Sequence, residues 1–464
     1  MPTNNFIAAD GEWNTPENWS LGHVPTSTED CTFTGCSDTG AVMITITDTD
    51  AHCKSADFST IPVAGYYFRG FYPRTLNVYG SVIFKSDLYL NLGKLYVGKD
   101  SSGSITSNGC DLTTISSIYV TGGTFTMTED LTAQNLLVGL GGTLVTNNYT
   151  LDIHDFGNNA ENVTLTLGSS IINCYSVSFN STTLTVTANT ATFNLPSGTS
   201  SNIDIALPGG IVKLASAPST TATVTLMSGT LDLNGKTITA GIFSSSNTNT
   251  RSLIDSAGGG KIIVNSLTGT IFNMGTSTNL TVSNTPAIDI GDSNNTLSGN
   301  VTFAGGGKAF GNFKVTKHAG NFTCDITGAN TFGTFTQETP DATYQYSGVR
   351  FTADTQTNVT SIVADGTSSY QITRSSITAA THTINDTSGT NTVTYNTITN
   401  EIAIGGATYV ASLESGNIDG GGGSGWFPVT NLATLKTWNG VAKAAIAKIN
   451  GVAIAGIKTW NGVA

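Results

Sequence analysis

Short runs in which apolar and polar residues alternate extend along the chain from about residue 75 to residue 415. In the segment 81–98 the apolar positions predicted to face one way are Val82, Phe84, Leu88, Leu90, Leu92, Leu95 and Val97. A spacing of two places successive apolar side chains on one face of a β-strand. Gly, Asn and Ser separate the runs, and the 3.6-residue period of a helix is not evident. We therefore predict an all-β chain.

Both a string of β-sandwiches and one parallel β-helix (β-solenoid) are compatible with many short strands. Three features favour the solenoid. Hairpin dipeptides do not recur at sandwich spacing, apolar residues come in pairs and triplets, and only 11% of the residues are charged. With about 20–25 residues per coil the segment holds roughly 14–17 coils. At about 4.8 Å per coil, these coils form a rod of roughly 70–80 Å.

Composition shifts divide the chain into four predicted parts. These are an N-terminal cap and lead-in (1–74), a β-solenoid (75–416), a Gly-rich linker (417–428) and a small C-terminal β-repeat module (429–464). Four consecutive glycines within the linker predict a flexible joint.

Tryptophans stand near both ends of the predicted solenoid. We expect Trp13 and Trp19 to cover the first coil and Trp426 to seal the last one. Pro16 and Pro25 lack backbone N–H donors, so they prevent a continuing strand ladder at the N-terminal end. Such caps protect exposed strand edges from pairing with other chains.

Net charge argues against nucleic acid as a partner. The chain carries a formal charge of −12 with 19 basic residues, and these are too thinly spread to neutralise a run of phosphates. Apolar runs are shorter than the roughly 18–20 residues of a membrane span, so membrane insertion is not expected. The first residues lack the pattern of a secretory signal, and synthesis and folding in a cytosol are therefore expected.

The six cysteines are expected to be buried thiols. Cys31, Cys36, His52 and Cys53 fall within one short region, but their spacing matches no zinc pattern. We predict neither a metal nor another cofactor.

Carboxylates and glycine-rich stretches are the candidates for catalytic motifs in this chain. Cleaving a polysaccharide needs two carboxylates across a groove, and the candidate pairs, Glu129 with Asp130 and Glu414 with Asp419, are merely sequence neighbours. The stretches 258–261 and 305–308, both Gly-Gly-Gly-Lys, lack the spacing of a phosphate-binding loop and predict turns between coils. We predict no catalytic residues and no enzymatic activity, although carboxylates from distant coils could converge.

Aromatic residues concentrate between residues 66 and 79. Tyr66, Tyr67, Phe71 and Tyr72 are the candidate binding or interface residues of this segment. Tyrosine beside arginine is typical of interface cores. Three interpretations stay open: the rings cover the start of the solenoid, contact another subunit, or stack on sugars.

The last 30 residues contain three near-copies of one unit, with Asn-Gly pairs at Asn439, Asn450 and Asn461. Asn-Gly between apolar residues predicts tight β-turns. Each unit has an apolar side, and these sides supply the remaining interface candidates: Leu435, Trp438, Val441, Ile446, Ile449, Val452, Ile457, Trp460 and Val463. Units this small cannot bury their own faces. They need neighbouring subunits or a receiving surface, or else they fold back on the end of the solenoid.

The pattern G-x-W-x-x-x-x-N-W-S-x-G-x-x-P, from Gly11 to Pro25, resembles the opening of long β-solenoid proteins of bacterial surfaces and phages. The stretches NNYTLDIHDF and GGGGSGW are similar to segments inside such solenoids. The tail resembles short C-terminal repeats of phage virion proteins. This resemblance implies a rod displayed on a particle or a cell, and it implies no catalytic residues.

The favoured hypothesis is a structural protein of a bacteriophage virion, either a tail fibre or spike or a head fibre or decoration. Such a protein is assembled in the host cytoplasm. Its expected partners are two further copies in a homotrimer, other virion proteins and host surface glycan, and its role is attachment to the host or to the particle. Two alternatives remain: an adhesin on a bacterial cell surface and a tailspike that depolymerises glycan.

Overall fold

A computed structural model describes residues 2–36, 43–47, 50–62, 66–70, 74–158, 161–179, 184–291, 299–318, 320 and 323–427, with four two-residue strands beyond them. The chain divides into two compact units. Unit 1 comprises Met1–Ile262 and Thr276–Pro286, and unit 2 comprises Ile263–Gly275 and Ala287–Ala464.

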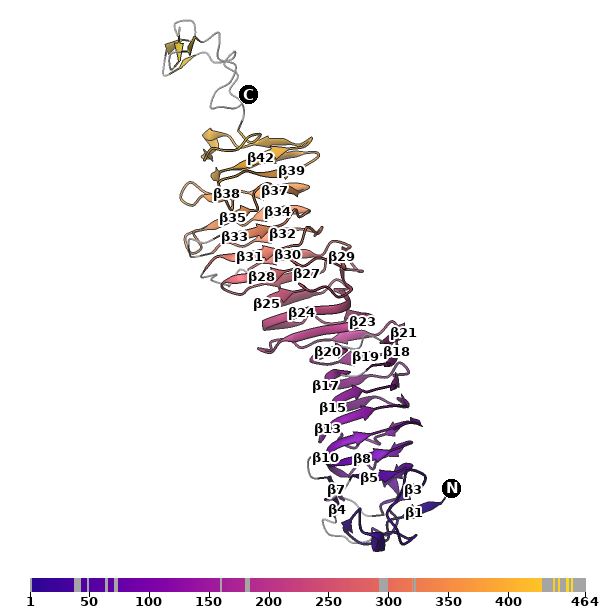
Figure 1. Ribbon diagram of the computed structural model, residues 1–464. Helices are drawn as coiled ribbons and strands as arrows, with labels where there is room; N and C mark the ends of the chain where they lie inside the picture. The colour runs from indigo at the N-terminus through magenta and orange to yellow at the C-terminus, as the bar shows by residue number, and fades with distance from the viewer. Residues whose placement is uncertain are drawn as a thin grey trace. The chain divides into compact units, whose positions relative to one another are not determined.

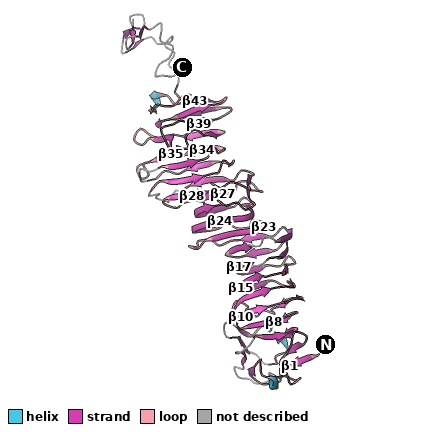
Figure 2. Ribbon diagram, in the orientation of Figure 1, coloured by secondary structure: helices cyan, strands magenta, loops and turns pink. Residues whose placement is uncertain are grey.

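The fold is a parallel β-solenoid of about 17 turns, which confirms the predicted all-β class and architecture (Figures 1 and 2). Leu131 lies opposite Leu151 and Ser347 opposite Ile372, one coil later. These spacings agree with the predicted coil length. Helical turns within the described residues are limited to three 3-10 segments, Pro16–Asn18, Phe58–Thr60 and Leu413–Ser415.

Unit 1 contains two side ladders and a longer set of paired strands. One side ladder is β1 (Thr3–Asn5), β3 (Asp30–Thr32), β6 (Ser55–Asp57), β9 (Val82–Ile83) and β12 (Ile105–Thr106). The other is β11 (Ser102–Gly103), β14 (Thr124–Thr126), β16 (Thr143–Val145), β18 (Thr164–Gly168) and β21 (Thr185–Asn189). The longer set is β2 (Gly11–Glu12), β4 (Met43–Ile46), β5 (Ala51–Cys53), β7 (Tyr67–Gly70), β8 (Thr75–Val78), β10 (Tyr89–Tyr96), β13 (Ile115–Val120), β15 (Leu131–Val138), β17 (Leu151–Asn158), β19 (Ile171–Asn173), β20 (Ser176–Phe179), β22 (Thr192–Asn194), β23 (Ile203–Leu214), β24 (Ser219–Asp232), β25 (Thr237–Ser244), β26 (Arg251–Ile254) and β29 (Leu280–Ser283).

Unit 2 has the same organisation. Its main strands are β28 (Gly269–Asn273), β30 (Ala287–Ile290), β31 (Val301–Ala304), β32 (Phe313–Val315), β33 (Cys324–Thr327), β34 (Thr334–Gln337), β35 (Ser347–Phe351), β37 (Ser361–Ala364), β38 (Ile372–Ser376), β41 (Asn396–Ile398) and β44 (Ile418–Asp419). Smaller ladders join β36 (Gln356–Asn358), β39 (His382–Asn385) and β42 (Glu401–Ile404), and β40 (Thr390–Thr392) with β43 (Thr408–Val410). Strand β27 (Lys261–Val264) lies where the chain passes from one unit to the other.

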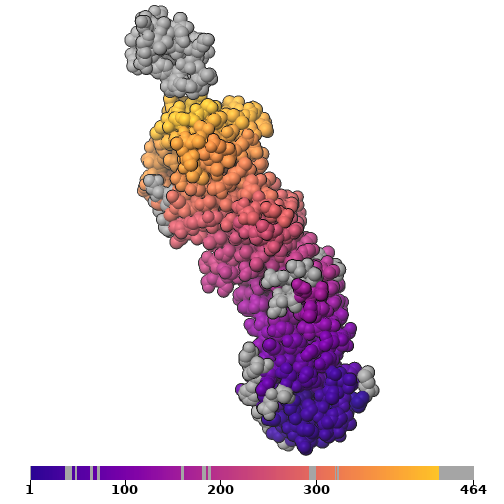
Figure 3. Space-filling model, in the orientation of Figure 1, coloured from indigo at the N-terminus to yellow at the C-terminus, as the bar shows by residue number. Residues whose placement is uncertain are grey.

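Within each unit the colours of Figure 3 follow one another in bands, because each coil packs on the coils adjacent to it in sequence. Strand residues alternate between the interior and the surface, as in β18, where Leu165 and Leu167 are buried between half-buried Thr and Gly. Phe303, Phe313, Phe332 and Phe335 stack through the interior of unit 2.

Asparagines at the turns bind each coil to the coil before it. Asn147 and Asn234 have φ of 50° and 49°, in the left-handed region that Asn tolerates better than most residues. Their side-chain amides donate to Met127 O and Leu214 O, each at 2.9 Å, one coil earlier. These contacts explain why Asn is abundant at positions that the hydrophobic pattern marks only as turns.

Parallel pairing begins at the N-terminal end of the described chain, where Thr3 lies opposite Asp30. Segment 1–74, predicted as cap and lead-in, therefore already contains coils of the solenoid. Trp13 and Trp19 are buried in unit 1, and Trp19 Nε1 donates to Trp13 O at 2.7 Å. Their rings lie edge to face, 4.8 Å apart.

The described part of the predicted linker is bonded to the preceding coil. Gly420 N donates to Ile398 O, and Ser424 N donates to Glu401 O. Trp426 is buried, with its ring centroid 4.9 Å from that of Tyr409. Residues 417–427 are therefore joined to the preceding coil by backbone hydrogen bonds, and the predicted flexible joint over 417–428 stays a prediction. Glycine permits the turns that bring this segment back: Gly421 and Gly422 have φ of 82° and 74°.

Beyond residue 427 four strands are described, without side chains. Strand β45 (Thr437–Trp438) pairs antiparallel with β46 (Val441–Ala442), and β47 (Lys448–Ile449) pairs antiparallel with β48 (Val452–Ala453). These pairs flank Asn439–Gly440 and Asn450–Gly451, as the hairpin prediction requires. The third copy lies outside the described residues.

No helix among the described residues is long and apolar enough to cross a membrane.

Candidate functional site

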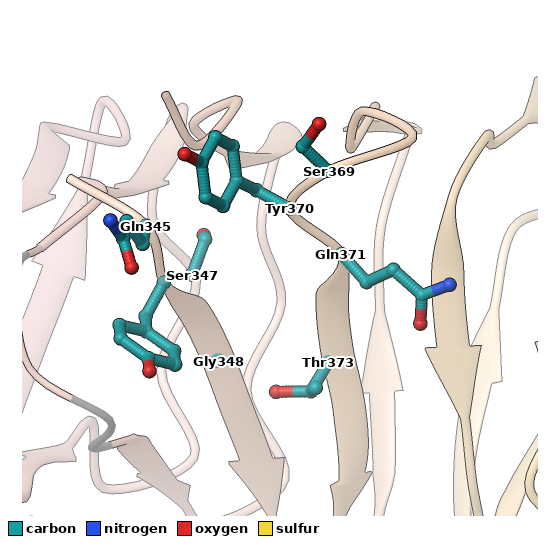
Figure 4. Close-up of a pocket in the computed structure, with 8 residues that line it drawn as sticks. Gln345, Ser347, Gly348, Ser369, Tyr370, Gln371 and Thr373 are labelled. Carbon is teal, nitrogen blue, oxygen red and sulfur yellow. The ribbon is translucent and has the colours of Figure 1, made fainter. Parts of the chain in front are cut away.

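A pocket of unit 2 lies on its outer surface, at the starts of β35 and β38. It has a volume of about 340 Å³. Its lining is Gln345, Tyr346, Ser347, Gly348, Ser369, Tyr370, Gln371 and Thr373. Figure 4 shows the Tyr370 ring between Ser369 and Gln345 at the upper side, while the Gln371 side chain points away.

The floor of the pocket is formed by two paired residues on adjacent coils, Gly348 and Thr373. Val349 and Arg374, which follow them, are buried in the interior. Because strand side chains alternate, Gly348 and Thr373 face outward. Gly348 has no side chain, so the floor at that point is bare backbone (Figure 4).

One wall is the segment 338–346 between β34 and β35. Asp341 anchors it: its Oδ1 accepts from Thr343 N and Tyr344 N, each at 2.8 Å, and its Oδ2 accepts from Lys317 Nζ at 2.6 Å. The hydrogen bond from Lys317 is the largest cause that lowers the pKa of Asp341, to about 2. The carboxylate is therefore charged at neutral pH and holds the wall in one conformation.

His318 fixes the base of the same wall. Its backbone exchanges hydrogen bonds with Tyr346 at 2.9 and 3.1 Å, and its Nδ1–H donates to Gly320 O at 2.7 Å. Burial lowers the pKa of His318 to about 4, so the imidazole is neutral at neutral pH. His318 and His382 are both buried, each with 1% of its surface exposed.

The opposite wall is the turn 365–371 between β37 and β38. Thr367 N donates to Tyr370 O at 2.8 Å, and Tyr370 N donates back to Thr367 O at 3.1 Å. Gln371 is held from the next coil, because Thr397 Oγ1 donates to its Oε1 at 2.9 Å. These contacts fix the backbone that carries the Tyr370 ring.

Ser347 supplies a buried polar group at the pocket. It is 2% exposed, and its Oγ has no hydrogen-bond partner among the described residues. Gln337, directly behind it, donates from Nε2 to Thr373 O at 3.2 Å, while its Oε1 likewise has no described partner. Buried polar atoms normally have partners. The Ser347 and Gln337 oxygens are almost fully covered by protein, so a ligand in the pocket does not reach them and they do not form part of the site.

The lining suits a neutral, polyhydroxylated ligand. It combines two tyrosine rings with the amide of Gln345 and the hydroxyls of Ser369 and Thr373, and none of its eight residues carries a carboxylate, imidazole, thiol or amine. Aromatic faces pack against the C–H faces of sugars, and amides and hydroxyls orient sugar hydroxyls. The usual hydrolysis of a glycosidic bond uses a pair of carboxylates, and the lining of this pocket supplies none. The geometry therefore favours binding of a saccharide.

A buried charged cluster lies in the interior of the same unit. Glu401 Oε1 accepts from Arg374 Nη2 at 2.6 Å and from Trp426 Nε1 at 2.7 Å, and Oε2 lies 2.9 Å from His382 Nε2. Burial alone would raise the pKa of Glu401, but the charge of Arg374 and the hydrogen bonds from His382 and Trp426 hold it below its ordinary value. The cluster has no exposed atom for a substrate to reach, because Arg374, His382 and Glu401 have side chains that are 0% exposed.

The described tyrosines of the predicted aromatic segment differ in burial and in the groups that they contact. Tyr66 is buried and its hydroxyl donates to Ala9 O at 2.9 Å, so it packs at the start of the solenoid. Tyr67 is 42% exposed and stacks on Tyr89 of the next coil at 4.7 Å. Phe71 and Tyr72 lie outside the described residues.

The candidates of the C-terminal repeat are not described at side-chain level. Trp438, Val441, Ile449 and Val452 lie in the four short strands, and the other five, Leu435, Ile446, Ile457, Trp460 and Val463, lie outside the described residues. Their role as an interface stays a prediction.

The candidate carboxylates accept hydrogen bonds from backbone N–H groups. Glu129 Oε1 accepts from Ser107 N, and Asp130 Oδ1 accepts from Thr150 N at 2.7 Å. Asp419 Oδ1 accepts from Gly421 N at 2.9 Å. Cys31, Cys36 and Cys53 are free and buried, as expected for thiols of the interior.

The pocket residues of unit 2 were not anticipated from the sequence. The available signal was a repeated pair, Tyr-Gln at residues 344–345 and again at 370–371, each just before an alternating strand. Strand pairing places these two segments on adjacent coils.

Fold and pocket together define a class, a parallel β-solenoid with a tyrosine- and amide-lined pocket on its outer surface. Comparison with known proteins adds no family to this class: the chain matches no protein-family model, no curated protein and no solved structure.

Proposed function

We propose that this protein is a non-catalytic attachment protein that binds a neutral surface glycan in the pocket between Tyr346 and Tyr370. The observation that carries the proposal is the lining of that pocket, two tyrosine rings with amides and hydroxyls and without a carboxylate, imidazole, thiol or amine.

The place that fits this activity best is the bacteriophage virion, as a tail fibre or spike or as a head fibre. Support comes from the resemblance of Gly11–Pro25 and of the tail repeats to segments of phage proteins. In this proposal the hairpins of the tail join the protein, as a homotrimer, to its particle. A bacterial surface adhesin would use the same pocket, displayed on a cell instead of on a phage particle.

Glycan binding is tested on the purified chain with a panel of neutral oligosaccharides and isothermal titration calorimetry. Tyr370→Ala and Tyr346→Ala are expected to weaken the best ligand about tenfold or more, which corresponds to about 1.4 kcal/mol or more. Tyr344→Ala is the matched control, because Tyr344 stands in the same wall but does not line the pocket. Equal affinity in all four proteins would refute the proposed site.

Assembly is tested by removing residues 429–464. The shortened chain should stay monomeric in sedimentation and should be missing from purified particles, while glycan binding persists. A shortened chain that still forms trimers and joins particles would contradict the role of the tail. Release of new reducing ends from a bound glycan would show that the protein is a depolymerase and not a non-catalytic attachment protein.

A further inference from the structure

A long acidic stretch covers much of unit 1. Between Lys99 and Lys213 the sequence has neither lysine nor arginine. The same stretch contains these carboxylates: Asp100, Asp111, Glu129, Asp130, Asp152, Asp155, Glu161 and Asp204. A surface of one sign attracts ligands of the opposite charge.

One pocket of unit 1 combines this charge with an exposed aromatic ring. It is lined by Ser86, Asp87, Leu88, Tyr89, Leu90, Gly109, Asp111 and Thr114, and its volume is about 230 Å³. Tyr89 is 57% exposed, although Tyr67 stacks on one side of its ring at 4.7 Å and 15°. Most exposed side chains are not held this way. The stack therefore presents an oriented ring to the pocket.

The two carboxylates of the pocket come from adjacent coils, which Cys110 Sγ joins by donating to Leu88 O at 3.3 Å. Asp111 is oriented by its own turn, because Oδ1 accepts from Thr113 N at 2.9 Å and from Thr113 Oγ1 at 2.6 Å. Asp87 lies 3.7 Å from Lys85 Nζ. One lysine therefore stands near two carboxylates, and the pocket keeps an excess of negative charge.

A second pocket with the same components lies further along unit 1. Its lining includes Asp152, Asn173, Tyr175 and Asn194, with a volume of about 210 Å³. Tyr175 is 45% exposed and stacks on His154 at 4.5 Å and 18°. Asn194 Nδ2 donates to Asn173 Oδ1 at 2.7 Å, which fixes both amides.

Strand pairing relates the two pockets. Leu112, next to Asp111, bridges to Ala133, and Ala133 lies opposite Ile153 in the second pocket. Asp152 in turn lies opposite Asn173, and Asn173 lies opposite Asn194. Figure 1 shows β10, β13, β15, β17 and β20 following one another in this order. The two pockets thus belong to one side of unit 1, and a chain-like ligand that follows the coils would meet both.

We infer that this side of unit 1 binds a saccharide that carries ammonium groups, with Tyr89 and Tyr175 contacting the sugars and Asp87, Asp111 and Asp152 pairing with the amines. Carboxylates supply charge complementarity, and a cation beside an aromatic face is attracted by the ring. The same acidic surface repels saccharides that carry carboxylate or phosphate groups. The inference uses a different site from the pocket of unit 2, so either one can fail without the other.

Two probes that differ only in the charged group test the inference: a hexamer of glucosamine and the matching hexamer of N-acetylglucosamine. Each is titrated into the full chain by calorimetry in slightly acidic buffer. The amine form is expected to bind at least tenfold more tightly. Raising the salt concentration should weaken it, since exposed charge pairs are screened.

Variants locate the binding. Tyr89→Ala and the double variant Asp87→Asn with Asp111→Asn should each lose about tenfold in affinity for the amine hexamer, while Tyr89→Phe keeps the ring and the affinity. Asp204→Asn is the matched control, because it removes a charge of the same acidic stretch outside both pockets and should change the affinity less than twofold. The circular dichroism spectrum and the guanidine midpoint of all these variants should match those of the unaltered chain, which shows that they are folded.

Three results would overturn the inference. The first is equal affinity for the two hexamers. The second is a loss of affinity in Asp204→Asn as large as in the pocket variants. The third is that calcium ions, added as calcium chloride, bind in a way that needs Asp87 and Asp111, while binding of the amine hexamer does not need these two residues. The second result would mean attraction to the acidic surface in general, and the third would make the pocket a cation site.

Discussion

Arg374 Nη2 donates a 2.6 Å hydrogen bond to Glu401 Oε1 in the interior of unit 2, and neither side chain has any exposed surface. Arg374 lies in β38 and Glu401 in β42, on a later coil. Arg374 also lies against the ring of Trp426, with Cζ 4.9 Å from the ring centroid. The pair therefore ties the last described coil to the interior through a charge that water does not reach.

Removing one partner of this pair is expected to be costly. Arg374→Met leaves Glu401 buried without its cation, and we expect the free energy of unfolding of unit 2 to fall by about 3–5 kcal/mol. Guanidine titration followed by circular dichroism measures the change. The double variant Arg374→Met with Glu401→Met should be more stable than either single variant, because no buried charge remains unpaired. Additive losses would show that the pair is not coupled.

Acid is expected to destabilise the wall of the unit 2 pocket through His318. Its folded pKa of about 4 lies below the ordinary value of 6.5, so the unfolded chain binds more protons between these values and stability falls as the pH is lowered through this window. The full loss is on the order of 3 kcal/mol. The protection factor of the Tyr346 amide, which is its exchange rate relative to the intrinsic rate at the same pH, should fall from pH 6.5 to pH 4. His318→Asn, which keeps a donor for Gly320 O but cannot be protonated, should remove this dependence; a variant with the same pH profile would contradict the assignment.

Filling the floor of the same pocket should separate binding from stability. Gly348 lies in β35 with its Cα facing outward, and it is absent from the residues with positive φ. Gly348→Val therefore fits the strand backbone, where valine is favoured over glycine, but its side chain enters the pocket. Glycan affinity should fall about tenfold or more, while the guanidine midpoint stays the same or rises. A lower midpoint would mean that Gly348 serves packing.

The turn asparagines give a prediction about stability alone. Asn234→Ala loses both the hydrogen bond to Leu214 O and the tolerance for a φ of 49°, and we expect a loss of about 2 kcal/mol. Asn234→Gly keeps the backbone conformation and should lose only about 1 kcal/mol. The difference between the two variants in a urea titration isolates the backbone cost. Equal losses would assign the whole effect to the hydrogen bond.

Alternation along single strands was enough to predict the class of fold. Leu165 and Leu167, for instance, point inward because the period of two belongs to each strand and needs no knowledge of its neighbours. The boundaries at both ends of the solenoid were harder to predict from the sequence. Four glycines predict a flexible segment from composition, but the bond from Ser424 N to Glu401 O depends on a coil that lies more than 20 residues earlier in the chain.

The pocket of unit 2 was hidden for the same reason. Tyr346 and Tyr370 are separated by one whole coil, and only the register of β35 with β38 brings them to one place. The buried Glu401 was equally hidden, since a charged residue in a strand predicts an outward position. Register between coils, which the sequence pattern does not encode locally, decides both sites.

Asn147 and Asn234 each donate to a carbonyl that lies 20 residues earlier, so the length of the coil between donor and acceptor is fixed by the bond. Deleting one residue inside such a coil would move that asparagine out of register with its carbonyl, whereas duplicating a whole coil would keep the bond. Insertions of complete coils are therefore expected to be tolerated better than insertions of single residues.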